Sequence, residues 1–102
     1  MAVKHLTKEN FAQELQVPGK HAVVDFYADW CGPCQGMKPI LEDLSEECPE
    51  VAFYKVNVDE QPELAAEFGV MSIPTLLVFR DGKLVNQAVG ARPKAGVLAL
   101  LG

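Results

Sequence analysis

The fold is decided by the stretch HAVVDFYADWCGPCQGMKPILEDL, residues 21–44, in which one hydrophobic pattern gives way to another. Residues 21–28 form an almost continuous apolar run, interrupted by Asp25, which is typical of a strand covered on both faces. After DWCGPC the apolar residues recur at helical spacing, on a stripe formed by Cys34, Met37, Leu41 and Leu44, with Ile40 alongside. A buried strand therefore leads directly into an amphipathic helix, and two cysteines lie at the junction.

Three further strands follow from similar patterns. Residues 51–59, VAFYKVNVD, predict a second buried strand. Residues 75–79, TLLVF, and 84–89, LVNQAV, predict two strands joined by a tight hairpin, because Asp81-Gly82 supplies the positive φ angles that such a turn needs.

Capping residues mark the other helices. Thr7 is a candidate N-cap for a helix over residues 8–15, and Asp59 for one over residues 60–68, which Gly69 closes in a left-handed conformation. Pro93 opens a short final helix with Val97, Leu98 and Leu101 on its apolar side.

With one strand counted ahead of the helix over residues 8–15, the order of elements is strand, helix, strand, helix, strand, helix, hairpin, helix. This alternation predicts an α/β fold with a central five-stranded, mostly parallel sheet, an antiparallel C-terminal hairpin and four flanking helices. In open α/β sheets, sites form where the carboxyl end of a strand meets the following helix. The WCGPC stretch, residues 30–34, occupies such a junction.

Composition excludes several classes of function. A chain of 102 residues with 49% hydrophobic content suits one domain, residues 1–102, without a separate cofactor-binding domain. A formal net charge of −5 and scattered basic residues argue against nucleic-acid binding. No apolar run is long enough to span a membrane, and residues 1–20 lack the apolar segment of a secretory signal. Three cysteines are too few for a secreted disulfide framework, which favours a reducing compartment.

The spacing of Cys31 and Cys34 permits a reversible disulfide. Cysteines at i and i+3 in a first helical turn lie on one face, within the range that an unstrained bridge requires. Cys31 stands at the helix start, where unpaired N–H groups and the helix dipole favour a thiolate, whereas Cys34 begins the buried stripe. We therefore expect Cys31 to be an exposed nucleophile and Cys34 a shielded resolving thiol.

Two other interpretations of the pair remain. Zinc needs four ligands, and the remaining candidates, Cys48, His5 and His21, have no recognised spacing, so no metal is expected. A structural disulfide closing so small a loop would constrain the unfolded chain little.

Over essentially its whole length the chain resembles the thioredoxin family. The matching segments are VVDFYADWCGPC (residues 23–34), Pro39, KVNVDEQPELAAEFGV (55–70), SIPTLLVF (72–79), DGK (81–83) and VGA (89–91). The resemblance implies a thioredoxin fold and a dithiol-disulfide oxidoreductase that reduces the disulfides of cytoplasmic client proteins through a Cys31–Cys34 disulfide. It also implies a monomer without a bound cofactor, recycled by a thioredoxin reductase.

Two further residues are implicated in proton transfer. Burial among apolar neighbours should raise the pKa of Asp25 towards the range useful for acid–base chemistry, although its side chain could instead reach solvent or a structural hydrogen bond. The resemblance implies that Asp25 lies beneath Cys34 and takes or relays its proton. Lys55 matches the family lysine near this aspartate, with an exposed strand lysine as the alternative.

Residues of a substrate groove also carry over by resemblance. Ile73-Pro74 matches the family's cis peptide bond beside the dithiol, where Ile73 offers its backbone to an extended substrate. Trp30 and Gly90 match positions bordering the groove, with a packed aromatic and a turn glycine as the alternatives. The remaining groove residues lie between the cysteines: Gly32 lets another chain approach, and Pro33 is tolerated in a first helical turn.

Several positions depart from the family pattern. Gln35 and Gly36 follow the second cysteine where a basic residue is frequent, which removes a nearby positive charge. Tyr27 stands where tryptophan is frequent, and Met71 where a basic residue is frequent. Cys48 is interpreted as an incidental small side chain, with a regulatory thiol as the alternative.

Other classes of function remain open at this point. A thioredoxin-like scaffold can serve as a binding module, a holdase or a subunit of a larger assembly, for which Trp30, Met71 and Ile73 would form an apolar rim. The same chemistry could also run in the oxidising or isomerising direction, which the Gly-Pro insert disfavours by family resemblance.

Overall fold

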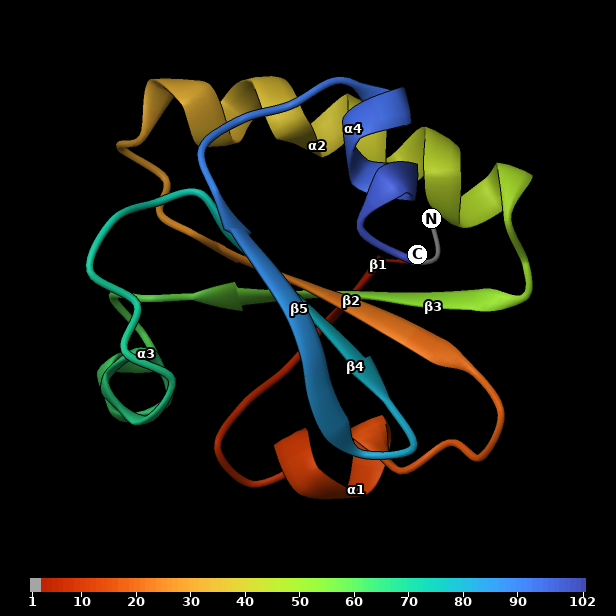
Figure 1. The fold of residues 1–102 in the computed structure, drawn as a ribbon. Helices are drawn as coiled ribbons and strands as arrows, with labels where there is room; N and C mark the ends of the chain where they lie inside the picture. Colours follow the sequence, from red (N-terminus) through yellow and green to blue (C-terminus); the bar gives the residue numbers. More distant parts are fainter. Residues whose placement is uncertain (1–2) are drawn as a thin grey trace.

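In residues 3–102, the part of the chain that the computed structural model describes, five strands form one sheet and four helices cover it (Figure 1). The strands are β1 (Val3–His5), β2 (His21–Tyr27), β3 (Val51–Asn57), β4 (Thr75–Arg80) and β5 (Lys83–Val89), and the helices are α1 (Phe11–Leu15), α2 (Gly32–Glu47), α3 (Pro62–Glu67) and α4 (Lys94–Ala99). The predicted five-stranded sheet with four flanking helices is therefore confirmed. None of the helices in this range is long and apolar enough to cross a membrane.

The sheet is mixed, with strand order β1-β3-β2-β4-β5. β3 pairs in parallel with β1 and β2, whereas β4 is antiparallel to both β2 and β5. Antiparallel pairing therefore extends from the C-terminal hairpin to the centre of the sheet, which the expected mostly parallel arrangement did not include. The reason is visible in Figure 1, where α3 lies beside the end of β3 and the chain re-enters the sheet from that same end.

The apolar run of β2 is explained by helices on both faces of the sheet. Val24 and Phe26 belong to a core cluster that contains Phe11 of α1 and Leu64 of α3. On the other face, Val23 belongs to a cluster with side chains of α2 and α4: Met37, Leu41, Leu44 and Val97. Figure 1 shows α1 and α3 on one side of the sheet and α2 and α4 on the other. Alternate β2 residues thus enter two separate cores.

Two of the predicted turns are confirmed. Asp81 (φ 53°) and Gly82 (φ 79°) both have positive φ in the β4–β5 hairpin, and Gly69 (φ 66°) follows α3. These are the left-handed conformations expected of a tight hairpin and a helix end.

The predicted N-cap Thr7 is wrong. Residues 8–10 form turns and α1 begins only at Phe11, with Asn10 as its N-cap. The backbone N–H of Thr7 donates to Asn10 Oδ1 (2.8 Å), and the Thr7 carbonyl accepts from the N–H of Phe11 (3.0 Å). Asn10 therefore organises the turn that leads into this helix, and the helix is shorter than the pattern predicted.

Candidate active site

The dithiol lies at the junction between the end of β2 and the start of α2. Cys31 and Cys34 form a disulfide with their Cα atoms 5.2 Å apart. Cys31 is the N-cap of α2, and its Sγ accepts the backbone N–H of Cys34 at 3.2 Å. An N–H group at a helix start stabilises negative charge, so the same contact favours a thiolate on Cys31 once the disulfide is reduced. This placement is the one that the residue pattern predicted.

The expectation that Cys31 is exposed is wrong for this disulfide-bonded state. Cys31 is 5% exposed and Cys34 is fully buried, so the two differ in the predicted direction but only slightly. Both pack with Tyr27 and Ala28, and Ile73 lies against the same cluster. A substrate can therefore reach only the small accessible surface of Cys31.

The loop before β4 approaches the dithiol from a distant part of the sequence. The peptide bond Ile73-Pro74 is cis, as the resemblance implied, and the Ile73 carbonyl oxygen lies 3.9 Å from Cys31 Sγ. Gly90 donates its N–H to the Pro74 carbonyl (2.8 Å) with a φ of 100°. A Cβ at Gly90 would meet nothing within 4 Å, so its backbone conformation, not crowding, requires glycine.

Trp30 is an exposed side chain with a fixed orientation. It is 72% exposed, which excludes the alternative of a packed aromatic, and its Nε1 donates to Asp59 Oδ2 at 2.8 Å. Asp59 was predicted to cap a helix, and that prediction is wrong because α3 begins at Pro62 with Gln61 as its N-cap. The signal for its actual role was available: Asp59 follows β3, whose carboxyl end lies beside that of β2 in a parallel pair.

Replacing Asp59 with alanine is expected to raise the KM for a protein disulfide about threefold, because a hydrogen bond of roughly 0.5 to 1.5 kcal/mol no longer orients the indole. The rate with a small neutral disulfide should not change, since such a reagent makes little contact with Trp30. Steady-state kinetics with both substrates measure the effect, and Glu60→Ala, which removes the neighbouring exposed carboxylate, is the control. Equal effects of the two substitutions would contradict a specific role for Asp59.

Asp25 is the buried acid of the site. It is 3% exposed, and its Oδ1 has no hydrogen-bond partner among residues 3–102, which removes the alternative of a solvated carboxylate. Burial raises the pKa of Asp25 from 3.8 to about 7, and the positive charge of Lys55 opposes that rise. Alternate residues of a strand share a face, so Asp25 lies on the same face of β2 as Val23 and Tyr27. That face is the one that α2 covers.

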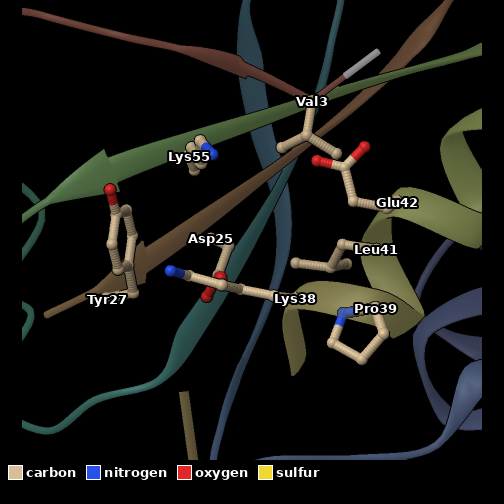
Figure 2. A pocket seen from close by; sticks show the side chains of 8 residues that line it. All are labelled: Val3, Asp25, Tyr27, Lys38, Pro39, Leu41, Glu42 and Lys55. Carbon is tan, nitrogen blue, oxygen red and sulfur yellow. The ribbon is translucent and has the colours of Figure 1, made fainter. Parts of the chain in front are cut away.

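A cavity of about 270 Å³ connects Asp25 with the surface (Figure 2). Lys55 is half-buried, lies directly opposite Asp25 in the β2–β3 register, and lines this cavity with it. The exposed-strand alternative for Lys55 is therefore wrong. The full lining is Val3, Asp25, Tyr27, Lys38, Pro39, Leu41, Glu42 and Lys55. Lys38 was missed in the sequence, although its position four residues after Cys34 places both on one side of α2.

Several residues on the surface around the dithiol are open to solvent. Gly32 and Pro33 are exposed in the first turn of α2, and a Cβ on Gly32 would meet nothing within 4 Å. Met71 is 96% exposed, as expected for an apolar rim. Gln35, which departs from the family pattern, donates its side-chain amide to the Asp29 carbonyl (3.0 Å) and so steadies the loop before Cys31.

The third cysteine is remote from this chemistry. Cys48 is the half-buried C-cap of α2, and it packs against the core between α2 and the sheet. Within residues 3–102, no group of three or more histidine, cysteine or acidic side chains is arranged to hold a metal ion.

Comparison with known proteins supports the same chemistry. The family model described as Thioredoxin matches residues 2–101. The chain is 46% identical over 101 residues to a thioredoxin of Alicyclobacillus acidocaldarius, with 98% of this chain and 95% of the relative covered. It is 43% identical over 96 residues to a thioredoxin of Streptomyces clavuligerus, with 94% of this chain and 90% of the relative covered.

A solved structure shows the same architecture. It comes from work described as the structural basis of the thiol-resolving mechanism in yeast mitochondrial 1-Cys peroxiredoxin via glutathione/thioredoxin systems. Its TM-score is 0.87 at 36% sequence identity, with 98% of this chain and 94% of that chain covered.

Proposed function

The chain belongs to the thioredoxin family, and we propose that this dithiol-disulfide oxidoreductase works as a reductant of protein disulfides, with Cys31 attacking and Cys34 resolving. The observation that carries the assignment of roles is the contact between Cys31 Sγ and the backbone N–H of Cys34. Once the disulfide is reduced, that contact favours a thiolate on Cys31, and within residues 3–102 no comparable backbone N–H contact is made to the sulfur of Cys34, which is fully buried.

The cycle consists of two exchanges of sulfur. The Cys31 thiolate attacks one sulfur of the substrate disulfide, the substrate S–S bond breaks, and the departing sulfur takes up a proton. Cys34 then loses its proton and attacks Cys31 Sγ, which breaks the mixed disulfide and releases the second substrate thiol. Two electrons pass to the substrate, and the Cys31–Cys34 disulfide is left behind.

Asp25 is proposed to accept the proton of Cys34 in the second exchange. A pKa of about 7 allows this carboxyl to take up and release a proton near neutral pH. Lys55, opposite it in the sheet, favours the ionised form that acts as the base. The buried and unpartnered Oδ1 supports this role, because a structural carboxylate would have its hydrogen bonds satisfied.

The substrate groove is proposed to run past the accessible side of Cys31. Ile73 lies within 4 Å of Cys31 Sγ through its carbonyl, so an extended substrate segment can pair with its backbone as an added strand. Pro74 and Gly90 hold that loop in place, and Trp30, Gly32 and Pro33 form the opposite rim.

The rest of the cycle follows from the family. We infer that a thioredoxin reductase restores the dithiol, that the chain forms one thioredoxin domain without a bound cofactor, and that it acts in the cytoplasm. A monomer suffices for the proposed cycle, because both thiols, Asp25 and the cis-proline loop belong to one chain.

The direction of the reaction can be tested by equilibrating the protein with glutathione buffers of known ratio and counting free thiols. A reductant is expected to stay disulfide-bonded until the potential of the buffer falls below the standard reduction potential of the glutathione couple. The variant with both Cys31 and Cys34 changed to serine should show no redox-dependent thiols other than Cys48. A midpoint well above the glutathione couple would indicate an oxidant or isomerase and overturn the proposal.

A further inference from the structure

A second lysine is placed at the cavity that leads to Asp25. Lys38 is an exposed residue of α2, yet its side chain lines this cavity together with Asp25 and Lys55. Its Nζ lies 5.8 Å from the centre of the Tyr27 ring, on the ring face, which is a cation–π distance. Figure 2 shows Lys38 extending from α2 across the cavity towards Tyr27.

This position matters because the walls of the cavity are mainly apolar. Val3, Pro39 and Leu41 offer no hydrogen bonds to a proton in transit, and Asp25 Oδ1 has no protein partner within residues 3–102. A proton that leaves Asp25 must therefore pass to water in the cavity. A cation beside the path attracts water and stabilises the carboxylate that remains.

The charged and titratable groups that face Asp25 come from three elements. Tyr27 lies two residues after Asp25 in β2, and Lys55 lies opposite Asp25 in β3. Lys38 and Glu42 project from α2, as does the thiol of Cys34 once reduced. The lining residue from β1 is Val3, and the β4 partner of Asp25 is Leu76, neither of which titrates. Among these groups the two lysines are positive and Glu42 is negative, and the charge of Lys55 favours the ionised form of Asp25.

We propose that Lys38 is a positioning residue for the proton transfer of Asp25: held against Tyr27, its ammonium group keeps the cavity hydrated and favours the ionised carboxylate while Cys34 resolves the mixed disulfide. This role rests on the proposed function of Asp25 and adds a second cation to it. Lys55 acts on Asp25 from the neighbouring strand β3, and Lys38 acts on it from the exposed surface of α2.

Rapid mixing of the reduced protein with dipyridyl disulfide, a neutral reagent, separates the two exchanges. Attack by Cys31 releases one pyridinethione, and attack by Cys34 on Cys31 releases the second. Lys38→Met keeps the length of the side chain and removes its charge. It is expected to raise the pH midpoint of the second phase by about half a unit, and to slow that phase about threefold below the midpoint, with no difference at alkaline pH.

Three comparisons decide the matter. Lys38→Arg should restore the midpoint. Lys94→Met should leave it unchanged, because Lys94 belongs to α4 and pairs with Asp43 and Glu47 near the far end of α2. Equal slowing of Lys38→Met at every pH, or a midpoint matching that of Lys94→Met, would overturn the role of Lys38. Asp25→Asn tests the underlying function separately: if it leaves the second phase unchanged, the role of Asp25 itself fails.

Discussion

Replacing Cys31 with serine is expected to reduce the rate of protein disulfide reduction to that of the uncatalysed reaction. The Cys31 sulfur must become covalently bound to the substrate, and a hydroxyl oxygen forms no stable bond of this kind to sulfur. The substitution therefore removes the chemical step itself and does not act by lowering the affinity for the substrate. Turnover of a protein disulfide with dithiothreitol as the electron source measures it directly.

Cys34→Ser is the matched control, because it removes the other sulfur and leaves the first exchange intact. This variant should react with one equivalent of substrate and remain joined to it through Cys31, since the resolving thiol is missing. Mass spectrometry of the intact adduct identifies the bond. The reverse pattern, in which Cys31→Ser forms the adduct and Cys34→Ser does not, would exchange the two proposed roles.

Replacing Asp25 with asparagine is expected to slow the resolving exchange on the order of 100-fold near pH 7, because a general base typically contributes at least that much. The first exchange should be nearly unaffected, since Cys31 is stabilised by the helix start and not by Asp25. The biphasic reaction with dipyridyl disulfide resolves both rates in one experiment.

The same substitution is expected to stabilise the fold above neutral pH. The pKa of Asp25 is raised from 3.8 to about 7 in the folded protein, so between these values the unfolded chain releases a proton that the folded protein keeps. Folding therefore loses stability as the pH rises from about 4 to about 7, by about 4 kcal/mol in total, and then levels off. Asparagine has no charge to desolvate and avoids this loss.

Urea unfolding of the oxidised proteins between pH 4 and pH 8 measures this effect. Asp25→Asn should match the unsubstituted protein near pH 4 and exceed it by about 2 to 4 kcal/mol at pH 8, since the asparagine amide still lacks partners. Asp29→Asn, at an exposed position just after the same strand, should show no such pH dependence. A difference that is constant with pH would contradict an elevated pKa for Asp25.

The elements with strong local patterns could be predicted from the sequence. The apolar run of β2, the helical stripe from Cys34 to Leu44 and the Asp81-Gly82 turn each reflect a single physical requirement. The place of β4 beside β2 could not be predicted in the same way, because strand order depends on which edge remains open after three strands have paired.

Errors at single residues have a common origin. Thr7 and Asp59 both have the side chain of a good N-cap, but capping competes with other partners. Asn10 starts α1 instead of Thr7, and Asp59 binds the indole of Trp30. Local propensity cannot predict that Asp59 binds Trp30, because the two residues are 29 positions apart in the chain.

The reacting residues of the candidate site could be predicted from the sequence, but the cavity beside them could not. The positions of Cys31 and Cys34 follow from the strand–helix junction, and the raised pKa of Asp25 follows from its apolar neighbours. The cavity did not follow, because its walls come from β1, β2, β3 and α2, and no one segment contains its pattern. Lys38 looked like an ordinary surface lysine for that reason.

The β4–β5 hairpin determines how the protein could be attached to a solid support. β4 begins beside the carboxyl end of β2, where Thr75 pairs with Phe26, and ends where Arg80 pairs with His21. The hairpin turn therefore lies at the opposite end of the sheet from the dithiol. A tether at the exposed Lys83 would leave the redox face turned towards solution, as an electrode coating requires, and would spare Asp81, whose Oδ1 accepts the N–H of Gly19.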